Sequence, residues 1–191
     1  KYSSALWEPG TRTLDEAEAA MLDLTCRRAG LMDGQRILEL GCGWGSLSLW
    51  IAERHPRARI TAVSNSASQG AFVRARAKAR GLANLEVVTA DMNDFAPAGR
   101  FDRVVSVEMF EHMRNWPELL RRIGGWVEPD GRLFVHVFAH RRFAYPFEVD
   151  GDGDWMARHF FTGGIMPAHE LLSHVPGPFE VEERWLVHGS H

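Results

Sequence analysis

The sequence has few cysteines, no long apolar run and no basic tract, and each shortage excludes a class of protein. Cys26 and Cys42 are the only cysteines among 191 residues, and their spacing matches no metal site. We therefore expect no disulfide framework, and we expect a reducing, cytoplasmic setting. No apolar segment approaches the roughly 20 residues that cross a bilayer, and no signal peptide is visible. The formal net charge is −3 without a basic stripe, which argues against nucleic acid as a partner.

The remaining composition, 45% apolar and 25% charged residues, is ordinary for one globular domain, expected over residues 1–191. Apolar patterning and helix-capping signals predict helices at residues 13–29, 46–54, 66–80, 116–127 and 167–174. They predict strands at residues 36–40, 59–64, 85–89, 101–107, 132–138 and 179–187. Strands that alternate with helices indicate an α/β fold with a Rossmann-like, doubly wound, mostly parallel sheet and helices on both faces.

Residues 139–166 break this alternation. They are rich in Arg, Phe, Gly and Asp and show no clear period. A long irregular segment within a compact domain is usually functional, so we expect a lid or substrate loop there.

A glycine-rich turn follows the first strand, in the stretch ILELGCGWGSL at residues 37–47. A ligand-free tight turn is one interpretation. The dinucleotide fingerprint fits Gly41 and Gly43, but Gly45 falls one residue early, and a P-loop would need a lysine that is missing. A third interpretation is S-adenosylmethionine, whose amino acid end needs both main-chain amides for its carboxylate and an acid, Glu39, for its ammonium. A pyrophosphate would be repelled by that acid.

The stretch ELGCGWG resembles the first motif of class I S-adenosylmethionine-dependent methyltransferases. Further segments resemble, in order, the cyclopropane fatty acid synthase superfamily, and within it the branch that contains coclaurine N-methyltransferase. These segments are KYSSALW at 1–7, ITAVSNSASQ at 60–69, SVEMFEHMRNW at 106–116, LFVHVFAHRRFAY at 133–145 and DWMARHFFTGGIMPAHELL at 154–172. The resemblance implies a methyltransferase that uses S-adenosylmethionine.

The resemblance also implies which residues contact the ribose of the cofactor. Many class I enzymes place an acid at the end of the second strand, whereas this superfamily uses the turn after that strand and a downstream glutamine. Ser64, Asn65 and Gln69 occupy those positions. The alternative for Asn65 is a simple helix N-cap.

Two further pairs complete the implied cofactor site. Asp91 and Met92 follow the third strand, where similar enzymes cover the adenine, although Asp91 could instead cap a turn. Tyr2 and Ser3 match a segment that closes over the cofactor in the superfamily. Surface anchoring or terminal disorder is the alternative for Tyr2.

The candidate catalytic residues follow the fourth strand, at the edge where α/β sheets bind ligands. Glu108, Glu111 and His112 form the E-x-x-E-H grouping, which in the resembled enzymes positions or deprotonates an amine. Glu108 would hold the amine, with Glu111 and His112 as a coupled pair. The alternative is a helix start at which acids favour the dipole. His136, on the fifth strand, is either a fourth catalytic residue or a satisfied core histidine.

Aromatic residues of the 139–166 segment could line an apolar acceptor pocket or stack on a cation. The candidates are Phe143, Tyr145, Trp155, Phe160 and Phe161. Packing alone is the alternative for some of them. The spacing of His136 and His140 predicts no metal site.

The acceptor stays open between two classes, an amine and a lipid. In the resembled superfamily, lipid-branch enzymes have a cysteine where this chain has Ser4, which weakens the lipid interpretation, although Ser4 could still hydrogen-bond an anion. They usually have a small residue where this chain has Glu108, which supports an amine. A lipid acceptor would imply transient membrane contact. An inactive cofactor-binding domain is a third possibility, because the family fold continues past residues 179–187 with a further strand. A truncated chain or a homodimer would accommodate that difference.

Overall fold

The computed structural model describes residues 3–148, 161 and 163–187. The chain divides into two compact units, and each is treated by itself. The first unit comprises Lys1–Ser106, Val127–Phe134 and Trp185–His191, and the second comprises Val107–Trp126 and Val135–Arg184. The single-domain expectation stays a prediction.

The sheet of five strands has the order β3-β2-β1-β4-β5. Its strands are β1 (Arg36–Leu40), β2 (Arg59–Ser64), β3 (Leu85–Thr89), β4 (Phe101–Val107) and β5 (Val127–His136). The neighbouring pairs β1–β2, β1–β4 and β2–β3 are parallel. Together with its flanking helices, this sheet confirms the predicted Rossmann-like α/β fold.

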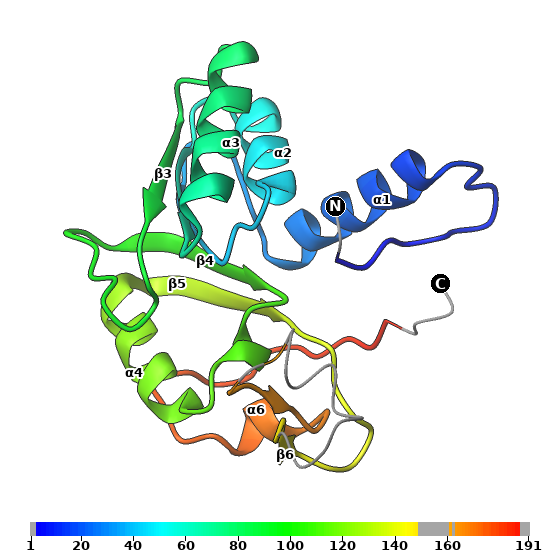
Figure 1. Ribbon diagram of the computed structural model, residues 1–191, viewed down its shortest axis with the longest axis vertical. Coiled ribbons are helices and arrows are strands. Elements are labelled where there is room, and N and C mark those ends of the chain that lie inside the picture. The colour runs from blue at the N-terminus through cyan, green and yellow to red at the C-terminus, as the bar shows by residue number, and fades with distance from the viewer. Residues whose placement is uncertain (1–2, 149–160, 162, 188–191) are drawn as a thin grey trace. The chain divides into compact units, whose positions relative to one another are not determined.

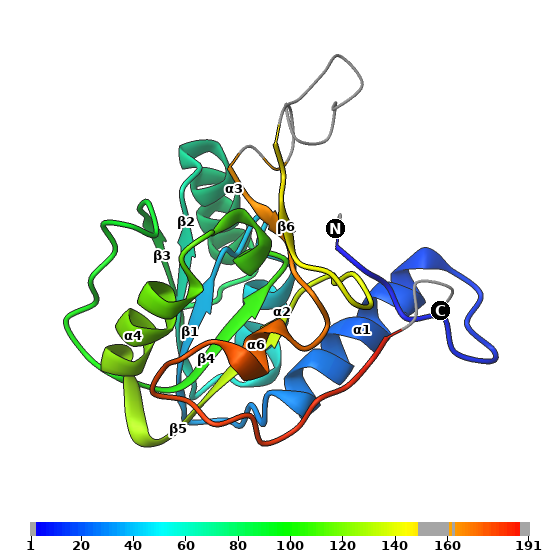
Figure 2. The same ribbon diagram turned by 90° about the horizontal axis from the view of Figure 1, so that it is seen from below.

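Three helices of the first unit follow the pattern predicted from the sequence (Figure 1; Figure 2). They are α1 (Leu14–Arg28), α2 (Ser46–Arg54) and α3 (Ala67–Ala79). The side chains of Thr13 and Glu16 form the capping box that starts α1. Helix α3 packs against α2 through Val73, Ala77 and Leu49.

The core of the first unit comes from near-continuous apolar strands. Ile37, Leu38 and Leu40 of β1 are fully buried, as are Val104 and Val105 of β4. Strands that are covered on both faces need such runs, because neither face reaches water. Burial of each large side chain contributes about 1.5–3 kcal/mol.

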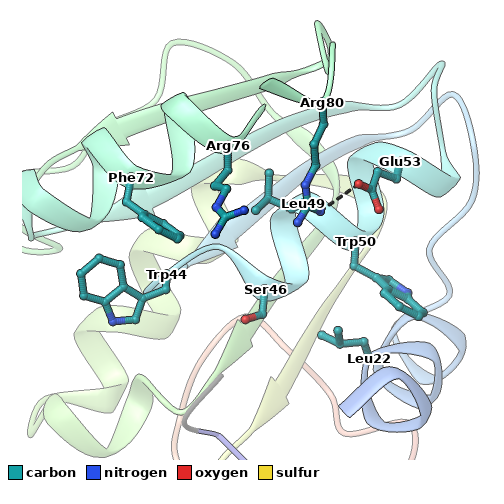
Figure 3. Close-up of a pocket in the computed structure, with 9 residues that line it drawn as sticks. All are labelled: Leu22, Trp44, Ser46, Leu49, Trp50, Glu53, Phe72, Arg76 and Arg80. Atoms are coloured by element: carbon teal, nitrogen blue, oxygen red, sulfur yellow. Dashed lines mark hydrogen bonds and ion pairs between the residues drawn. The ribbon is translucent and has the colours of Figure 1, made fainter. Parts of the chain in front are cut away.

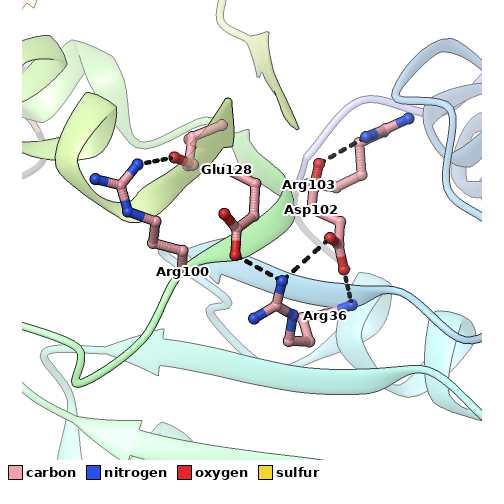
Figure 4. Close-up of polar contacts among 6 residues, drawn as sticks. Arg36, Arg100, Asp102, Arg103 and Glu128 are labelled. Atoms are coloured by element: carbon pink, nitrogen blue, oxygen red, sulfur yellow. Dashed lines mark hydrogen bonds and ion pairs between the residues drawn. The ribbon is translucent and has the colours of Figure 1, made fainter. Parts of the chain in front are cut away.

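A charged cluster ties the starting ends of three strands together (Figure 4). The Arg36 guanidinium contacts Glu128 Oε1 at 2.7 Å and Asp102 Oδ1 at 3.4 Å, and the Arg36 backbone N–H donates to Asp102 Oδ2. Arg100 donates to the carbonyl of Val127. These contacts join β1, β4 and β5 through side chains that the core does not bury.

The second unit contains short elements around one amphipathic helix. They are η1 (Phe110–His112), α4 (Trp116–Trp126), β6 (Tyr145–Pro146), β7 (Ile165–Met166) and α6 (Leu171–His174). Strands β6 and β7 pair in antiparallel fashion, with Tyr145 opposite Met166. The Trp116 indole N–H donates to the carbonyls of Phe110 and Met113, which fixes the passage from η1 into α4.

Three predicted elements differ from the structure. Strand β5 starts at Val127 rather than 132 and ends at His136 rather than 138, because its first residues are held by the side chains of Arg36 and Arg100 despite Pro129 and Gly131. The helix expected over 167–174 is limited to Leu171–His174. The irregular segment 139–166 contributes β6 and β7.

The predicted strand at 179–187 is wrong. All nine residues are described, and none is in a strand. Trp185 instead contacts the Phe134 ring at 6.3 Å between centroids and lies under the Arg28 guanidinium at 5.0 Å. Trp185 is thus held by ring contacts rather than by a backbone ladder. Separately, no helix within the described ranges is long and apolar enough to cross a membrane.

Candidate active site

The glycine turn between β1 and α2 has left-handed backbone at all three glycines. The φ angles are 80° for Gly41, 52° for Gly43 and 77° for Gly45. Other residue types rarely adopt this region. The N–H groups of Gly41 and Cys42 both donate to the Val63 carbonyl, at 3.0 and 2.9 Å. The turn is therefore anchored on β2.

This anchoring reduces the number of backbone N–H groups that a ligand can use. Since the Gly41 and Cys42 amides are committed to Val63, they are poor donors for a bound carboxylate. The N–H groups of Gly43 and Trp44 donate to no backbone carbonyl of the described residues. An anion at this turn would bind these later amides.

Gly45 has a packing role as well as a left-handed backbone. A Cβ at this position would lie 2.6 Å from Val73 Cγ2 and 2.8 Å from Val73 Cγ1. Gly45 is also the N-cap of α2. Helix α3 can pack against this turn only because the side chain is absent.

Glu39 is a buried carboxylate that accepts hydrogen bonds from Ser48. Its exposed fraction is 3%, and its Oε2 accepts a hydrogen bond from the Ser48 hydroxyl of α2. Burial raises the pKa of Glu39 to about 7, although the Ser48 hydrogen bonds oppose the rise. Ionised Glu39 would be stabilised by a cation, as the predicted ammonium contact requires. Sequence reasoning did not single out Ser48, which is nine residues away.

The end of β2 brings two of the predicted ribose residues together. The Ser64 hydroxyl donates to Gln69 Oε1 at 2.9 Å, and Ser64 is buried. Asn65 is exposed. The N-cap of α3 is Ser66, whose hydroxyl accepts from the Gln69 N–H, so Asn65 is not the cap.

The remaining cofactor candidates are Asp91, Met92, Ser3 and Tyr2. Asp91 Oδ1 accepts from the Asn93 backbone N–H at 2.7 Å and from the Asn93 amide at 2.8 Å. This is the turn-capping alternative for Asp91, and its adenine role stays a prediction. Met92 and Ser3 are half-buried, and Tyr2 lies outside the described residues.

In the second unit, Glu108 and His136 are in contact. The Glu108 N–H donates to the His136 carbonyl at 2.8 Å, and Glu108 Oε1 lies 3.5 Å from His136 Nε2. Glu108 has φ 53° and is the one non-glycine residue in the described chain with positive φ. Such strain concentrates at functional positions. The contact fits both a catalytic His136 and a core histidine satisfied by Glu108, so the catalytic role of His136 stays a prediction.

Glu111 is almost fully buried and interacts with Glu108. Its exposed fraction is 1%, and its Oε2 has no hydrogen-bond partner among the described residues. Burial, and then repulsion by the Glu108 charge, raises the pKa of Glu111 to about 8. The expected partner of Glu111 was His112. The charge that acts on Glu111 in the structure is that of Glu108, three residues earlier, and its pairing with His112 stays a prediction.

His112 belongs to an aromatic cluster centred on Phe161. The His112 ring stacks on Phe161 at 5.2 Å and 26°, and Phe147 stacks on it at 4.9 Å. Phe138 meets the same ring edge-on at 5.2 Å. His112 keeps an exposed edge, but its partial burial lowers its pKa.

The aromatic residues named from the sequence differ in burial, and their role toward an acceptor stays a prediction. Phe161 is buried in the cluster, whereas Phe143 and Tyr145 are exposed and contact His140. Trp155 and Phe160 lie outside the described residues. Sequence reasoning missed Phe138 and Phe147. The Phe147 N–H donates to the Gly164 carbonyl, and the Phe147 ring stacks on that of Phe161.

A separate groove of about 470 Å³ lies on the helices of the first unit (Figure 3). Leu22 of α1, Trp50 of α2 and Phe72 of α3 line it, and an ion pair of 2.8 Å joins Arg80 to Glu53 beside it. None of the predicted site residues lines this groove. Among the described residues, no group of three or more His, Cys, Asp or Glu could hold a metal ion.

The fold and the glycine turn define a Rossmann-like domain of the class I methyltransferase type. The chain belongs to the family described as mycolic acid cyclopropane synthetase, which matches residues 1–182.

Known relatives fall on both sides of the amine and lipid division. (S)-Coclaurine N-methyltransferase of Thalictrum flavum subsp. glaucum is 39% identical over the whole chain, which covers 54% of that protein. Cyclopropane-fatty-acyl-phospholipid synthase of Escherichia coli (strain K12) is 28% identical over the whole chain, which covers 47% of that protein. The chain thus spans about half the length of the curated relatives it matches.

Two solved structures share the fold of this chain. The crystal structure of coclaurine N-methyltransferase bound to N-methylheliamine and SAH is 41% identical, with a TM-score of 0.84 over 92% of this chain and 52% of that one. A mycolic acid cyclopropane synthase complexed with SAH and CTAB shares the fold, with a TM-score of 0.77 at 23% identity over 92% of this chain and 64% of that one.

Proposed function

We propose that this chain is the catalytic domain of an S-adenosylmethionine-dependent methyltransferase that transfers a methyl group to the nitrogen of a small, largely apolar amine. Its similarity to coclaurine N-methyltransferase, at 39–41% identity, supports this acceptor class. The observation that carries the proposal is the group formed by Glu108, Glu111 and His136.

The first unit has residues that suit the cofactor. The buried Glu39 carboxylate matches an ammonium, the Gly43 and Trp44 amides match a carboxylate, and the Ser64–Gln69 pair offers polar groups for a ribose. When bound, S-adenosylmethionine supplies a methyl group on a cationic sulfur, which is a good leaving group. The role of the chain is then to bind and orient both reactants, which lowers the entropic part of the barrier.

The second unit has residues that suit an amine. An ammonium carries no lone pair, so the acceptor must lose a proton before its nitrogen reacts. Glu108 offers a carboxylate to hold the ammonium, held in place by its contact with His136. Glu111, whose pKa is raised to about 8, acts as a proton acceptor only in its ionised form, which becomes the major form above that pH. The Phe161 cluster supplies an apolar surface for the rest of the acceptor.

A lipid acceptor is the second candidate. The family and the 28% identity to the Escherichia coli phospholipid enzyme favour it. Glu108 suits it less well than an amine, because a neutral double bond, unlike an ammonium, offers the carboxylate no charged partner when the substrate binds.

One screen separates the candidates. The chain is incubated with S-adenosylmethionine and either a panel of secondary arylalkylamines or vesicles of unsaturated phospholipid, and methyl addition is measured by mass spectrometry. Methylated amine is the expected product. Methylated or cyclopropanated lipid without amine product would support the lipid candidate. A melting temperature raised by S-adenosylhomocysteine, without product from either panel, would indicate a binding domain that is inactive alone.

A further inference from the structure

We infer that Arg114 is a positioning residue, which holds Phe161 on His112 and Gly164 on Glu111 through a hydrogen bond to the carbonyl of Gly163. Arg114 Nε donates to Gly163 O at 2.7 Å. The inference deepens the proposed function and rests on it for its effect on turnover.

Arg114 belongs to the short segment between η1 and α4, which hydrogen bonds from Trp116 hold in place. It lies between η1, which contains Glu111 and His112, and α4. The Trp116 indole holds this segment by donating to the carbonyls of Phe110 and Met113, at 2.9 and 3.0 Å. The guanidinium is therefore supplied by the same stretch of chain as the candidate catalytic residues.

The carbonyl that Arg114 binds belongs to a tight turn with two glycines. Gly163 has φ 77°, and the Gly164 N–H donates to the Phe161 carbonyl at 2.8 Å. This turn sets where Phe161 lies. Because Phe161 stacks on His112 at 5.2 Å, a displacement of the turn would separate the two rings.

Gly164 of this turn packs against the backbone of Glu111. A Cβ on Gly164 would overlap the Glu111 carbonyl oxygen, so the two backbones are in close contact. The Gly164 carbonyl also accepts from the Phe147 N–H at 3.0 Å, which brings a second ring onto Phe161. One charge-assisted hydrogen bond thus controls one wall of the proposed acceptor site.

The test compares Arg114→Gln with Arg121→Gln. Arg121 lies in α4 and pairs on the surface with Glu118, so it serves as a matched loss of one arginine. Loss of a hydrogen bond from a charged group predicts that KM for the amine rises about tenfold in the Arg114 variant. KM for S-adenosylmethionine is expected to stay unchanged in both variants, and Arg114→Lys is expected to fall between Arg114→Gln and the natural protein.

A second measurement is independent of turnover. NMR ring-proton contacts between His112 and Phe161, assigned with His112→Gln, are expected to weaken in Arg114→Gln, and the His112 pKa to rise toward its ordinary value. Phe161→Leu should raise the His112 pKa without any change of charge. Retained ring contacts in Arg114→Gln, or equal effects from Arg121→Gln, would overturn the inference.

The two measurements also separate this inference from the proposed function. If the natural protein methylates no amine, the proposed function fails, while the ring contacts still decide the role of Arg114. If Arg114→Gln does not fold, Arg114→Lys and Phe161→Leu supply the comparison. An unchanged His112 titration in both would then refute the inference.

Discussion

The carboxylate of Glu108 lies 3.5 Å from Nε2 of His136, and the backbone N–H of Glu108 donates to the carbonyl of the same histidine. The last residue of β5 therefore fixes both the backbone and the side chain of the residue that follows β4. A glutamate held at two points loses little further freedom when it binds an ammonium, which favours pre-organised binding.

We expect Glu108→Gln to lower turnover of a secondary amine by at least about tenfold, below the usual range for general acid–base residues. The amide is neutral and cannot stabilise an ammonium. Initial rates measured by mass spectrometry test this, with Glu118→Gln as control, since Glu118 lies on the surface beside Arg121. Unchanged turnover in Glu108→Gln would remove this residue from the chemistry.

Cofactor binding is expected to weaken below neutral pH because of Glu39. With a pKa near 7, Glu39 is mostly protonated at pH 6 and mostly ionised at pH 8. Only the ionised form attracts the ammonium of the ligand. The affinity for S-adenosylhomocysteine should therefore be about tenfold lower at pH 6 than at pH 8. Calorimetry in two buffers of different ionisation enthalpy should detect proton release on binding.

The matching variant for that experiment is Glu39→Gln, which should bind more weakly and with little dependence on pH. Glu53→Gln removes a partly exposed carboxylate that pairs with Arg80 and should retain the natural profile. A pH dependence that persists in Glu39→Gln would show that another group is responsible.

Gly45→Ala should destabilise the protein by about 2–4 kcal/mol, because it adds both backbone strain and overlap with Val73. Gly81→Ala is a matched control, since Gly81 has φ 68° but nothing within 4 Å of an added Cβ. It should cost only about 1–2 kcal/mol, the strain alone. Urea unfolding measures both, and equal costs would contradict the packing role of Gly45.

Glu111 should make the protein less stable as the pH rises from about 5 to 9. Its pKa is raised to about 8 in the folded chain, so the folded state holds a proton that the unfolded state has lost. The free energy of unfolding contributed by this group is thus largest below pH 4.5 and falls until the pH passes 8.

Glu111→Gln removes that titration and should flatten the decline, gaining at least about 1 kcal/mol over the natural protein at pH 9. Thermal unfolding across this pH range is the measurement. Glu118→Gln should keep the natural slope, because the Arg121 guanidinium holds the pKa of Glu118 below its ordinary value. A Glu111→Gln variant with the natural slope would assign the pH effect elsewhere.

Sequence patterning predicted the bounds of four strands of the sheet. The bounds of β1, β2, β3 and β4 match the expected ranges because strongly apolar runs between turn signals leave little choice. Residues 179–187 show the limit of this argument. They are rich in apolar residues, but a strand also needs a neighbour, and Trp185 makes ring contacts instead.

Site residues were predictable where a motif sets them close in sequence. The spacing of Glu108 and Glu111 and the position of Gln69 after Ser64 are of this kind. Contacts that depend on distant pairing were not predictable. Phe147 stacks on Phe161 in a region where β6 pairs with β7, and the contact of Glu108 with His136 joins residues 28 positions apart. The left-handed backbone of Glu108 is favoured by no propensity.

At position 108, the left-handed backbone makes the residue that is best for stability different from the residue that carries the proposed chemistry. Glycine would relax this conformation, so laboratory evolution that rewards heat tolerance alone should drift toward Glu108→Gly and discard the carboxylate. Selections for new acceptors should therefore score product formation in every round, or the resulting enzymes will be sturdy and inert.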